Sequence, residues 1–271
     1  MLSDIILNLE GERREAYVRA VLRASGSNDV VGYIGRHIPT DIFDAIGLMA
    51  LPVYGVDGDI LKFSVERGLC PLIDATLTYA KTDRCPLIHS SRLIVVDDGC
   101  PVMAREMARL TGKDVYIYHG SDSERIERLT AKLEAVYGRH IERNALAAAR
   151  AGRERCAALL HRLKTYSELS GLQIYILEYY LNFLTVSERM DILCEVTETV
   201  KFSDTPGEFI PVRIQSGGGI YRGIDRIMAG RAYRIMEEGC YAERTHYDFV
   251  YENCPFAEGT KISYDILREG N

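Results

Sequence analysis

The chain has 271 residues, a net charge of −6 and a pI near 5.6, so its overall charge argues against a protein that binds nucleic acid or anionic membranes. Hydrophobic residues make up 47% and charged residues 27%, as in a globular chain long enough to bury a core. No apolar run approaches the roughly 18 residues of a membrane span, and the N-terminus is acidic where a secretory signal would be basic. We therefore expect a cytoplasmic protein with reduced cysteines and no membrane partner.

Apolar runs alternate with helical patterns over the first 120 residues. Strands are predicted at the start of 30–39 and at 51–56, 92–98 and 114–119. Helices are predicted over 4–24, over 40–50 with Thr40 as N-cap, after a turn within 68–81, and over 101–112. Strands that alternate with helices of about 12 residues indicate βαβ units and a mainly parallel sheet.

The pattern changes to long helices from 121 to about 201, and the segment 201–211 has the composition of a linker. The residues after it predict a strand, a glycine turn and a helix up to Gly239, followed by a strand that ends near Cys254. We therefore expect an α/β protein of two Rossmann-like lobes with mainly parallel sheets, joined by helices. The predicted boundaries are 1–120 for the N-terminal lobe, 121–204 for the helical connecting segment and 205–271 for a reduced C-terminal lobe.

Four of the seven cysteines are followed by proline: Cys70, Cys85, Cys100 and Cys254. Chance pairing of seven cysteines with eight prolines would give about 0.2 such steps. A following proline keeps a cysteine extended and outside a helix, so its thiolate is able to point into a cleft. In parallel sheets, ligands bind beyond the carboxyl ends of the strands, where Cys100 and Cys254 are expected. Cys-Pro steps also occur at ligands of iron–sulfur clusters.

Four segments in this order carry a resemblance to a known family: "VGYIGRHIPTDIFDAIGLMALPVYG", "GLCPLIDATLTYA", "RLIVVDDGCPVM" and "YDFVYENCPF". They resemble the early strand, proline loop and three cysteine motifs of the iron–sulfur subunits of 2-hydroxyacyl-CoA dehydratases and benzoyl-CoA reductases. The helical middle of the chain is similar to the helices between the lobes of that family. The resemblance covers most of 30–165 and, more weakly, 205–256.

The resemblance implies that Cys70, Cys100 and Cys254 bind a 4Fe–4S cluster whose fourth iron stays open for single-electron chemistry. It implies a lyase (dehydratase) or reductase subunit, with an ATP-dependent iron–sulfur activator as electron donor. A second subunit or a homo-oligomer is expected, and an acyl-CoA or another small molecule is the implied substrate. His37 and Asp41 flank the proline loop where the family approaches its substrate, so both are candidate catalytic residues.

Other readings of the cysteines stay open. Cys85 has the proline but no place in the family pattern, so it is either structural or a ligand of a larger or second cluster. Cys240 is able to replace Cys254 as the third ligand. Cys156 and Cys194 lie in apolar helical patterns and are predicted to be core residues.

The polar candidates and the overall function have alternatives too. His37 and Asp41 are also compatible with an exposed loop and a helix first turn, and His119 has a similar position after a strand. The run "SGGG" (216–219) is compatible with a phosphate cradle but more simply with a turn. The chain could instead be a non-catalytic cluster carrier that transfers electrons or assists assembly, or a metal-free module that binds a small molecule.

Overall fold

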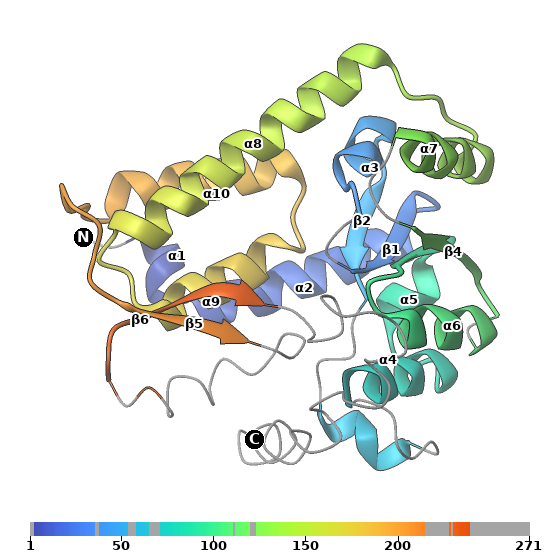
Figure 1. Cartoon of the computed structure of the whole chain (residues 1–271), viewed down its shortest axis with the longest axis horizontal. Coiled ribbons are helices and arrows are strands. Elements are labelled where there is room, and N and C mark those ends of the chain that lie inside the picture. The colour runs from blue at the N-terminus through green and yellow to red at the C-terminus, as the bar shows by residue number, and fades with distance from the viewer. Residues whose placement is uncertain are drawn as a thin grey trace.

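The computed structural model describes residues 3–35, 38–53, 58–64, 71–110, 112–119, 123–214, 228 and 230–238. They form a parallel sheet with helices on both faces, next to a group of long helices (Figure 1). The predicted α/β class with a parallel sheet is therefore confirmed.

The main sheet has four strands in the order β2-β1-β3-β4, and every neighbouring pair is parallel. The strands are β1 (Val30–Ile34), β2 (Met49–Pro52), β3 (Leu93–Asp97) and β4 (Asp114–Tyr118). They match the predicted strands, although β2 begins two residues earlier than its apolar run suggested.

The interior strand β3 is buried along its whole length. A parallel strand covered on both faces needs apolar and β-branched side chains on both, which the run "LIVV" provides. Ile94 and Val96 belong to the core beneath α4 (Pro71–Lys81), α5 (Pro86–Ser90) and α6 (Pro101–Leu110). Leu93 and Val95 belong to the core beneath α3 (Asp41–Ile46) and α7 (Ser123–Tyr137).

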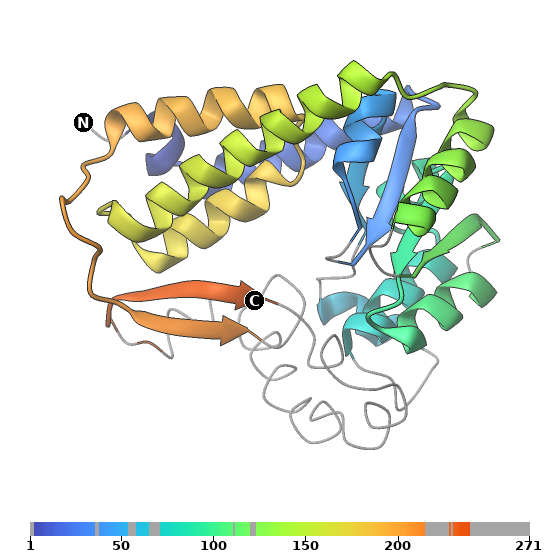
Figure 2. The same cartoon turned by 45° about the horizontal axis from the view of Figure 1, so that its top comes forward.

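The long helices lie to one side of the sheet, as Figure 2 shows. They are α2 (Leu9–Ser25), which follows the short α1 (Asp4–Leu7), and α8 (Arg143–Tyr166), α9 (Gly171–Leu181) and α10 (Val186–Thr199). A 3₁₀ helix, η1 (Gly58–Phe63), precedes α4. Serine and threonine cap the starts of α9 and α10: Ser170 pairs reciprocally with Gln173, and Thr185 with Glu188.

The N-terminal helix α2 links the sheet to the long helices. Beyond Leu9 at its start, its buried residues are small, Ala16, Ala20 and Ala24, and its main contacts are with α9 and α5. Side chains from α2, α9 and α10 share one core with those above one face of the sheet. The predicted 1–120 lobe and the helical segment therefore pack together through a common apolar interior.

A second, two-stranded parallel sheet consists of β5 (Ile210–Ile214) and β6 (Tyr233–Glu238). The helix predicted up to Gly239 is wrong at 233–238, because this segment pairs with β5. Gly230, three residues before β6, has a φ of +79°, a left-handed conformation that the interior of a helix does not contain. Tyr233 then packs against the start of α9, where a Cβ at Gly171 would lie 2.5 Å from its carbonyl oxygen.

Within the described ranges, no helix combines the length and the apolar character needed to cross a membrane.

Candidate functional site

The strand order creates a switch point at the carboxyl edge of the main sheet. From β1 the chain passes through α3 to β2 on one side, whereas β3 pairs with the other side of β1. The segments that follow β1 and β3 therefore diverge, and the edge between them is where open parallel sheets bind ligands. Of the candidate site residues, Asp41 follows β1 and Cys100 follows β3.

Gly35 and Asp97 lie in close contact at this switch point. Gly35 directly follows β1 with a φ of +130°, and a Cβ built on it would lie 2.0 Å from the Cβ of Asp97. Only a residue without a side chain lets the end of β1 pass so near to the end of β3. The glycine thus permits the close approach of the two chain segments that frame the candidate site.

The loop from β3 into α6 holds Cys100 in a defined position. Asp97 is buried, and its Oδ1 accepts a hydrogen bond from the Gly99 N–H at 2.6 Å, which closes a tight turn. The carbonyl of Cys100 accepts a bond from the Ala104 N–H at 3.0 Å, so the cysteine stands immediately before the first helical residue, Pro101. Proline suits this first position because its missing N–H would have no intrahelical partner there.

Cys100 lies between the apolar core and the start of α6. The residue is partly buried, lies against the core and is not in a disulfide. It directly precedes the N-terminus of α6, and the N-terminal end of a helix favours negative charge.

His119 joins this loop from the neighbouring strand. It directly follows β4, and its Nδ1 lies 2.9 Å from Oδ2 of Asp98. The Asp98 N–H also donates to the carbonyl of Tyr118 at 3.1 Å, which ties the ends of β3 and β4 together. The histidine and aspartate side chains are 61% and 42% exposed, so the pair is accessible from solvent. A histidine oriented by a carboxylate is able to accept or donate a proton beside the Cys100 loop.

Asp41 lies at the start of α3, on the same edge of the sheet, and already has a partner. Its Oδ2 accepts a hydrogen bond from Nε of Arg150 in α8 at 2.7 Å. One turn further along each helix, Asp44 pairs in the same way with Arg153. These two pairs hold α8 against α3, a structural use of Asp41 that the sequence did not reveal; its catalytic role stays a prediction. Thr40 occupies the predicted N-cap position, but its side chain makes no capping hydrogen bond.

Several predicted site residues lie outside the described residues: His37, Cys70, Cys240, Cys254 and the run 216–219. Cys70 directly precedes α4 in the chain, as Cys100 precedes α6. Among the residues that the structure does describe, no three His, Cys, Asp or Glu side chains are grouped so that they could hold a metal ion. The predicted convergence of three cysteines therefore stays a prediction.

The remaining cysteines in the described ranges have different environments. Cys85 caps α5: its Sγ accepts a hydrogen bond from the Ile88 N–H at 3.5 Å, and burial raises the pKa of its thiol. Cys156 is buried in the core as predicted. Cys194 is exposed on α10, so its assignment to the core is wrong; the buried face of that helix consists of Leu193 and Val196.

In the comparisons with known proteins, no family model matches the chain, and no curated protein matches it either.

Proposed function

We propose that this chain is an iron–sulfur protein that holds a 4Fe–4S cluster with Cys100 as one ligand. The observation that carries the proposal is the position of Cys100: a partly buried thiol, outside any disulfide, after an interior parallel strand and before the first turn of a helix. Thiolates are the usual ligands of such clusters, and this edge of a parallel sheet is the usual place for a ligand. Cys70, which directly precedes α4, is proposed as the second ligand.

For the third ligand, the second sheet supports Cys240 beside the predicted Cys254. Strand β6 ends at Glu238, two residues before Cys240, and it runs parallel to β5. Cys240 thus follows a parallel strand in the chain much as Cys100 follows β3. The parallel pair β5–β6 also supports the proposal of a second, reduced Rossmann-like lobe, because parallel neighbours require a crossover between them.

The reaction proposed is that of a 2-hydroxyacyl-CoA dehydratase-like or reductase-like subunit. A cluster with an open iron would supply single-electron chemistry, and a separate ATP-dependent activator would supply the electron. Pro101 would keep the ligand cysteine outside α6. His119, held by Asp98, would hold or move a proton at its second ring nitrogen, Nε2. A second subunit or a homo-oligomer, an acyl-CoA substrate and a cytoplasmic location belong to the same proposal.

Iron and acid-labile sulfide in anaerobically purified protein test the cluster. We expect about four irons per chain in the wild type and loss of most of them in Cys100→Ser. Cys85→Ser is the matched control, because it alters another Cys-Pro step whose sulfur caps a helix. Cys194→Ser controls for an exposed cysteine. Wild-type protein without iron and sulfide, or full retention in Cys100→Ser, would contradict the proposal.

Separate Cys240→Ser and Cys254→Ser variants identify the third ligand. The variant that lacks this ligand should lose most of its iron, and the other variant should keep the iron content of the wild type.

One observation favours the metal-free alternative, a module that binds a small molecule through its sheet edge. The Cys85-Pro86 step has a sufficient structural explanation, with the sulfur as N-cap and the proline in the first turn of α5. If all Cys-Pro steps act in this way, the wild type should contain no iron under any conditions of purification. The same analysis of iron and sulfide therefore separates the two functions.

A further inference from the structure

The guanidinium of Arg234, on β6, lies against the carboxyl end of α8. Its Nε donates to the carbonyl of Lys164 at 2.8 Å, and its Nη2 donates to the carbonyl of Ser167 at 3.3 Å. Its Nη1 donates to the carbonyl of Tyr233 at 2.9 Å, and the residue is only 7% exposed. The last carbonyls of an α-helix have no partner within the helix, and their partial negative charge favours a cation. Arg234 therefore caps α8 from a strand that is distant in the chain.

Strand β6 has a second anchor, at the start of α9. A Cβ on Gly171, the first residue of α9, would lie 2.5 Å from the carbonyl oxygen of Tyr233 and 2.6 Å from an atom of its ring. Tyr233 is buried in this contact, which only a residue without a side chain permits. Two consecutive residues, Tyr233 and Arg234, thus hold β6 against the turn between α8 and α9.

Helix α8 is also tied to the main sheet, nearer to its amino end. Arg150 pairs with Asp41 on α3, the helix that follows β1. Arg153 pairs with Asp44 on the same helix. Arg150 and Lys164 lie fourteen residues apart on α8, or about 21 Å along its axis at 1.5 Å per residue. Because α8 is one uninterrupted helix, it sets the separation between the anchors of the main sheet and those of β6.

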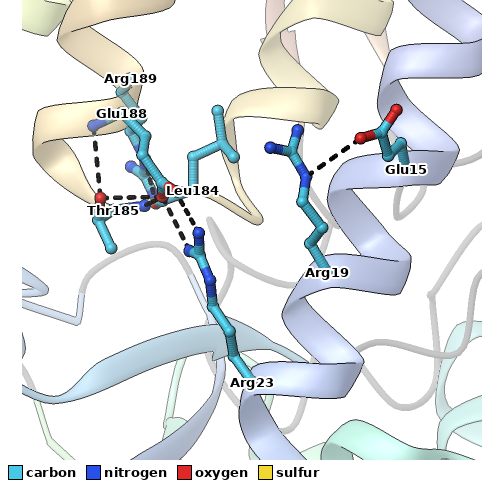
Figure 3. A network of polar contacts seen from close by, with 7 residues as sticks. All are labelled: Glu15, Arg19, Arg23, Leu184, Thr185, Glu188 and Arg189. Carbon is cyan, nitrogen blue, oxygen red and sulfur yellow. Dashed lines mark hydrogen bonds and ion pairs between the residues drawn. The ribbon is translucent and has the colours of Figure 1, made fainter.

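Helices α2 and α10 support α8 and α9. α10 packs along α8, and α2 packs along α9. Figure 3 shows how these supports are joined: the guanidinium of Arg23 on α2 donates two hydrogen bonds to the carboxylate of Glu188 on α10, one of them 3.0 Å long. Glu188 also accepts a hydrogen bond from the backbone N–H of Thr185 at 2.9 Å, which fixes the start of α10. The two helices that hold β6 are therefore themselves held in place relative to the main sheet.

The carboxyl end of β6 is directed toward the main sheet. Figures 1 and 2 both show the arrowheads of β5 and β6 pointing to the side of the molecule that contains this sheet. Cys240 follows Glu238, the last residue of β6, by two residues, so their Cα atoms are at most about 7 Å apart. Cys254 follows Glu238 by sixteen residues, a length of chain that reaches up to about 55 Å. The anchors of β6 therefore constrain Cys240 closely and Cys254 hardly at all.

We propose that Arg234 is a positioning residue for the third cluster ligand, and that this ligand is Cys240. The inference rests on the proposed function, because it requires a cluster that Cys100 also binds. Cys100 would approach this cluster from the carboxyl edge of the main sheet, and Cys240 from the carboxyl end of β6. Arg234 contacts neither the cluster nor a substrate; it acts by fixing β6 on α8.

Iron, acid-labile sulfide and the EPR spectrum of the dithionite-reduced protein test the proposal after anaerobic purification. We expect Arg234→Gln to lose most of its iron, as Cys240→Ser does, and to change the EPR spectrum of the remaining cluster while far-UV circular dichroism stays that of a folded protein. Arg234→Lys keeps a cation that is able to donate to a helix carbonyl, so it should restore part of the iron content. The double variant Arg234→Gln with Cys240→Ser should lose no more iron than Cys240→Ser alone, because both substitutions act on the same ligand.

Arg162→Gln is the matched control. Arg162 lies near the same end of α8, and its guanidinium lies 4.2 Å from the ring centroid of Phe202, which precedes β5 in the chain. Its removal disturbs the contact of α8 with this segment but leaves the anchors of β6 intact. The control should keep the iron content and the EPR spectrum of the wild type.

Gly171→Ala tests the same role without changing the arginine, and it decides the question if Arg234→Gln does not fold. Its methyl group would displace Tyr233 and with it β6, so this variant too should lose iron. A wild type without iron and sulfide would contradict the proposed function itself. If the wild type contains iron, full iron content with an unchanged EPR spectrum in a folded Arg234→Gln or Gly171→Ala variant overturns the positioning role alone. Loss of iron in Cys254→Ser but not in Cys240→Ser overturns the assignment of the ligand.

Discussion

The contact between Gly35 and Asp97 makes a sharp prediction about stability. In Gly35→Ala the new methyl group would lie 2.0 Å from the Cβ of Asp97, and the backbone φ of +130° disfavours any side chain. The backbone conformation should cost about 1–3 kcal/mol and the steric overlap about 1–3 kcal/mol more. We expect a loss of about 2–6 kcal/mol, a large part of the 5–15 kcal/mol that is typical of folded domains.

The assay is equilibrium unfolding in urea, followed by far-UV circular dichroism because the chain has no tryptophan. Gly138→Ala is the matched control: its φ of +67° is also left-handed, but no atom lies within 4 Å of the added methyl group. The difference between the two variants reports the contact with Asp97 together with the larger backbone cost at a φ of +130°, which lies outside the left-handed helical region that Gly138 occupies. A Gly35→Ala variant within about 0.5 kcal/mol of Gly138→Ala would refute the proposed close approach of the two strand ends.

Three further predictions concern ion pairs and a buried hydroxyl. The hydrogen bond from Arg23 lowers the pKa of Glu188 to about 2, so the pair should stabilise the fold at a pH above the ordinary pKa of glutamate and lose this effect as the pH falls from about 5 to 2. In Glu188→Gln, the free energy of unfolding measured in urea should therefore fall less over that pH interval, by roughly 1 kcal/mol after solvent screening. Asp44→Asn leaves Arg153 without its carboxylate partner and should lower the free energy of unfolding by about 1 kcal/mol. The double variant Asp44→Asn with Arg153→Gln should be destabilised by less than the sum of the effects of the two single substitutions. Tyr137→Phe removes a buried 2.7 Å hydrogen bond to a carbonyl of β1 and should cost about 1–2 kcal/mol in urea unfolding, whereas no change would show that water replaces the hydroxyl.

Most of the main sheet was predictable from local pattern. The runs that become β1, β3 and β4 are short, apolar and bounded by turn residues, and such runs form strands wherever both faces are covered. The helical periodicity of 121–201 likewise became α7 to α10. Position relative to the strands was predictable for Cys100 and His119, because each follows a strand in the chain.

The failures lie where partners distant in the chain decide the conformation. Residues 233–238 have a composition compatible with a helix, and pairing with β5 makes them a strand. Cys194 shares a helix with buried neighbours but faces solvent, since a difference of one residue rotates a side chain by about 100° around the axis. The role of Cys85 as a helix cap was missed because sulfur is an uncommon capping atom.

The amino-acid sequence alone determined the alternation of strands and helices and the location of Cys100 after an apolar strand, because these depend on neighbours within a few residues. The parallel direction of the strands followed from that alternation, since a helix between two strands returns the chain to the same end of the sheet. The tertiary structure alone decided that Asp41 meets Arg150, 109 residues away, and that Asp44 meets Arg153. Such pairings depend on how helices pack against the sheet, and packing brings together charges that no local spacing in the chain relates.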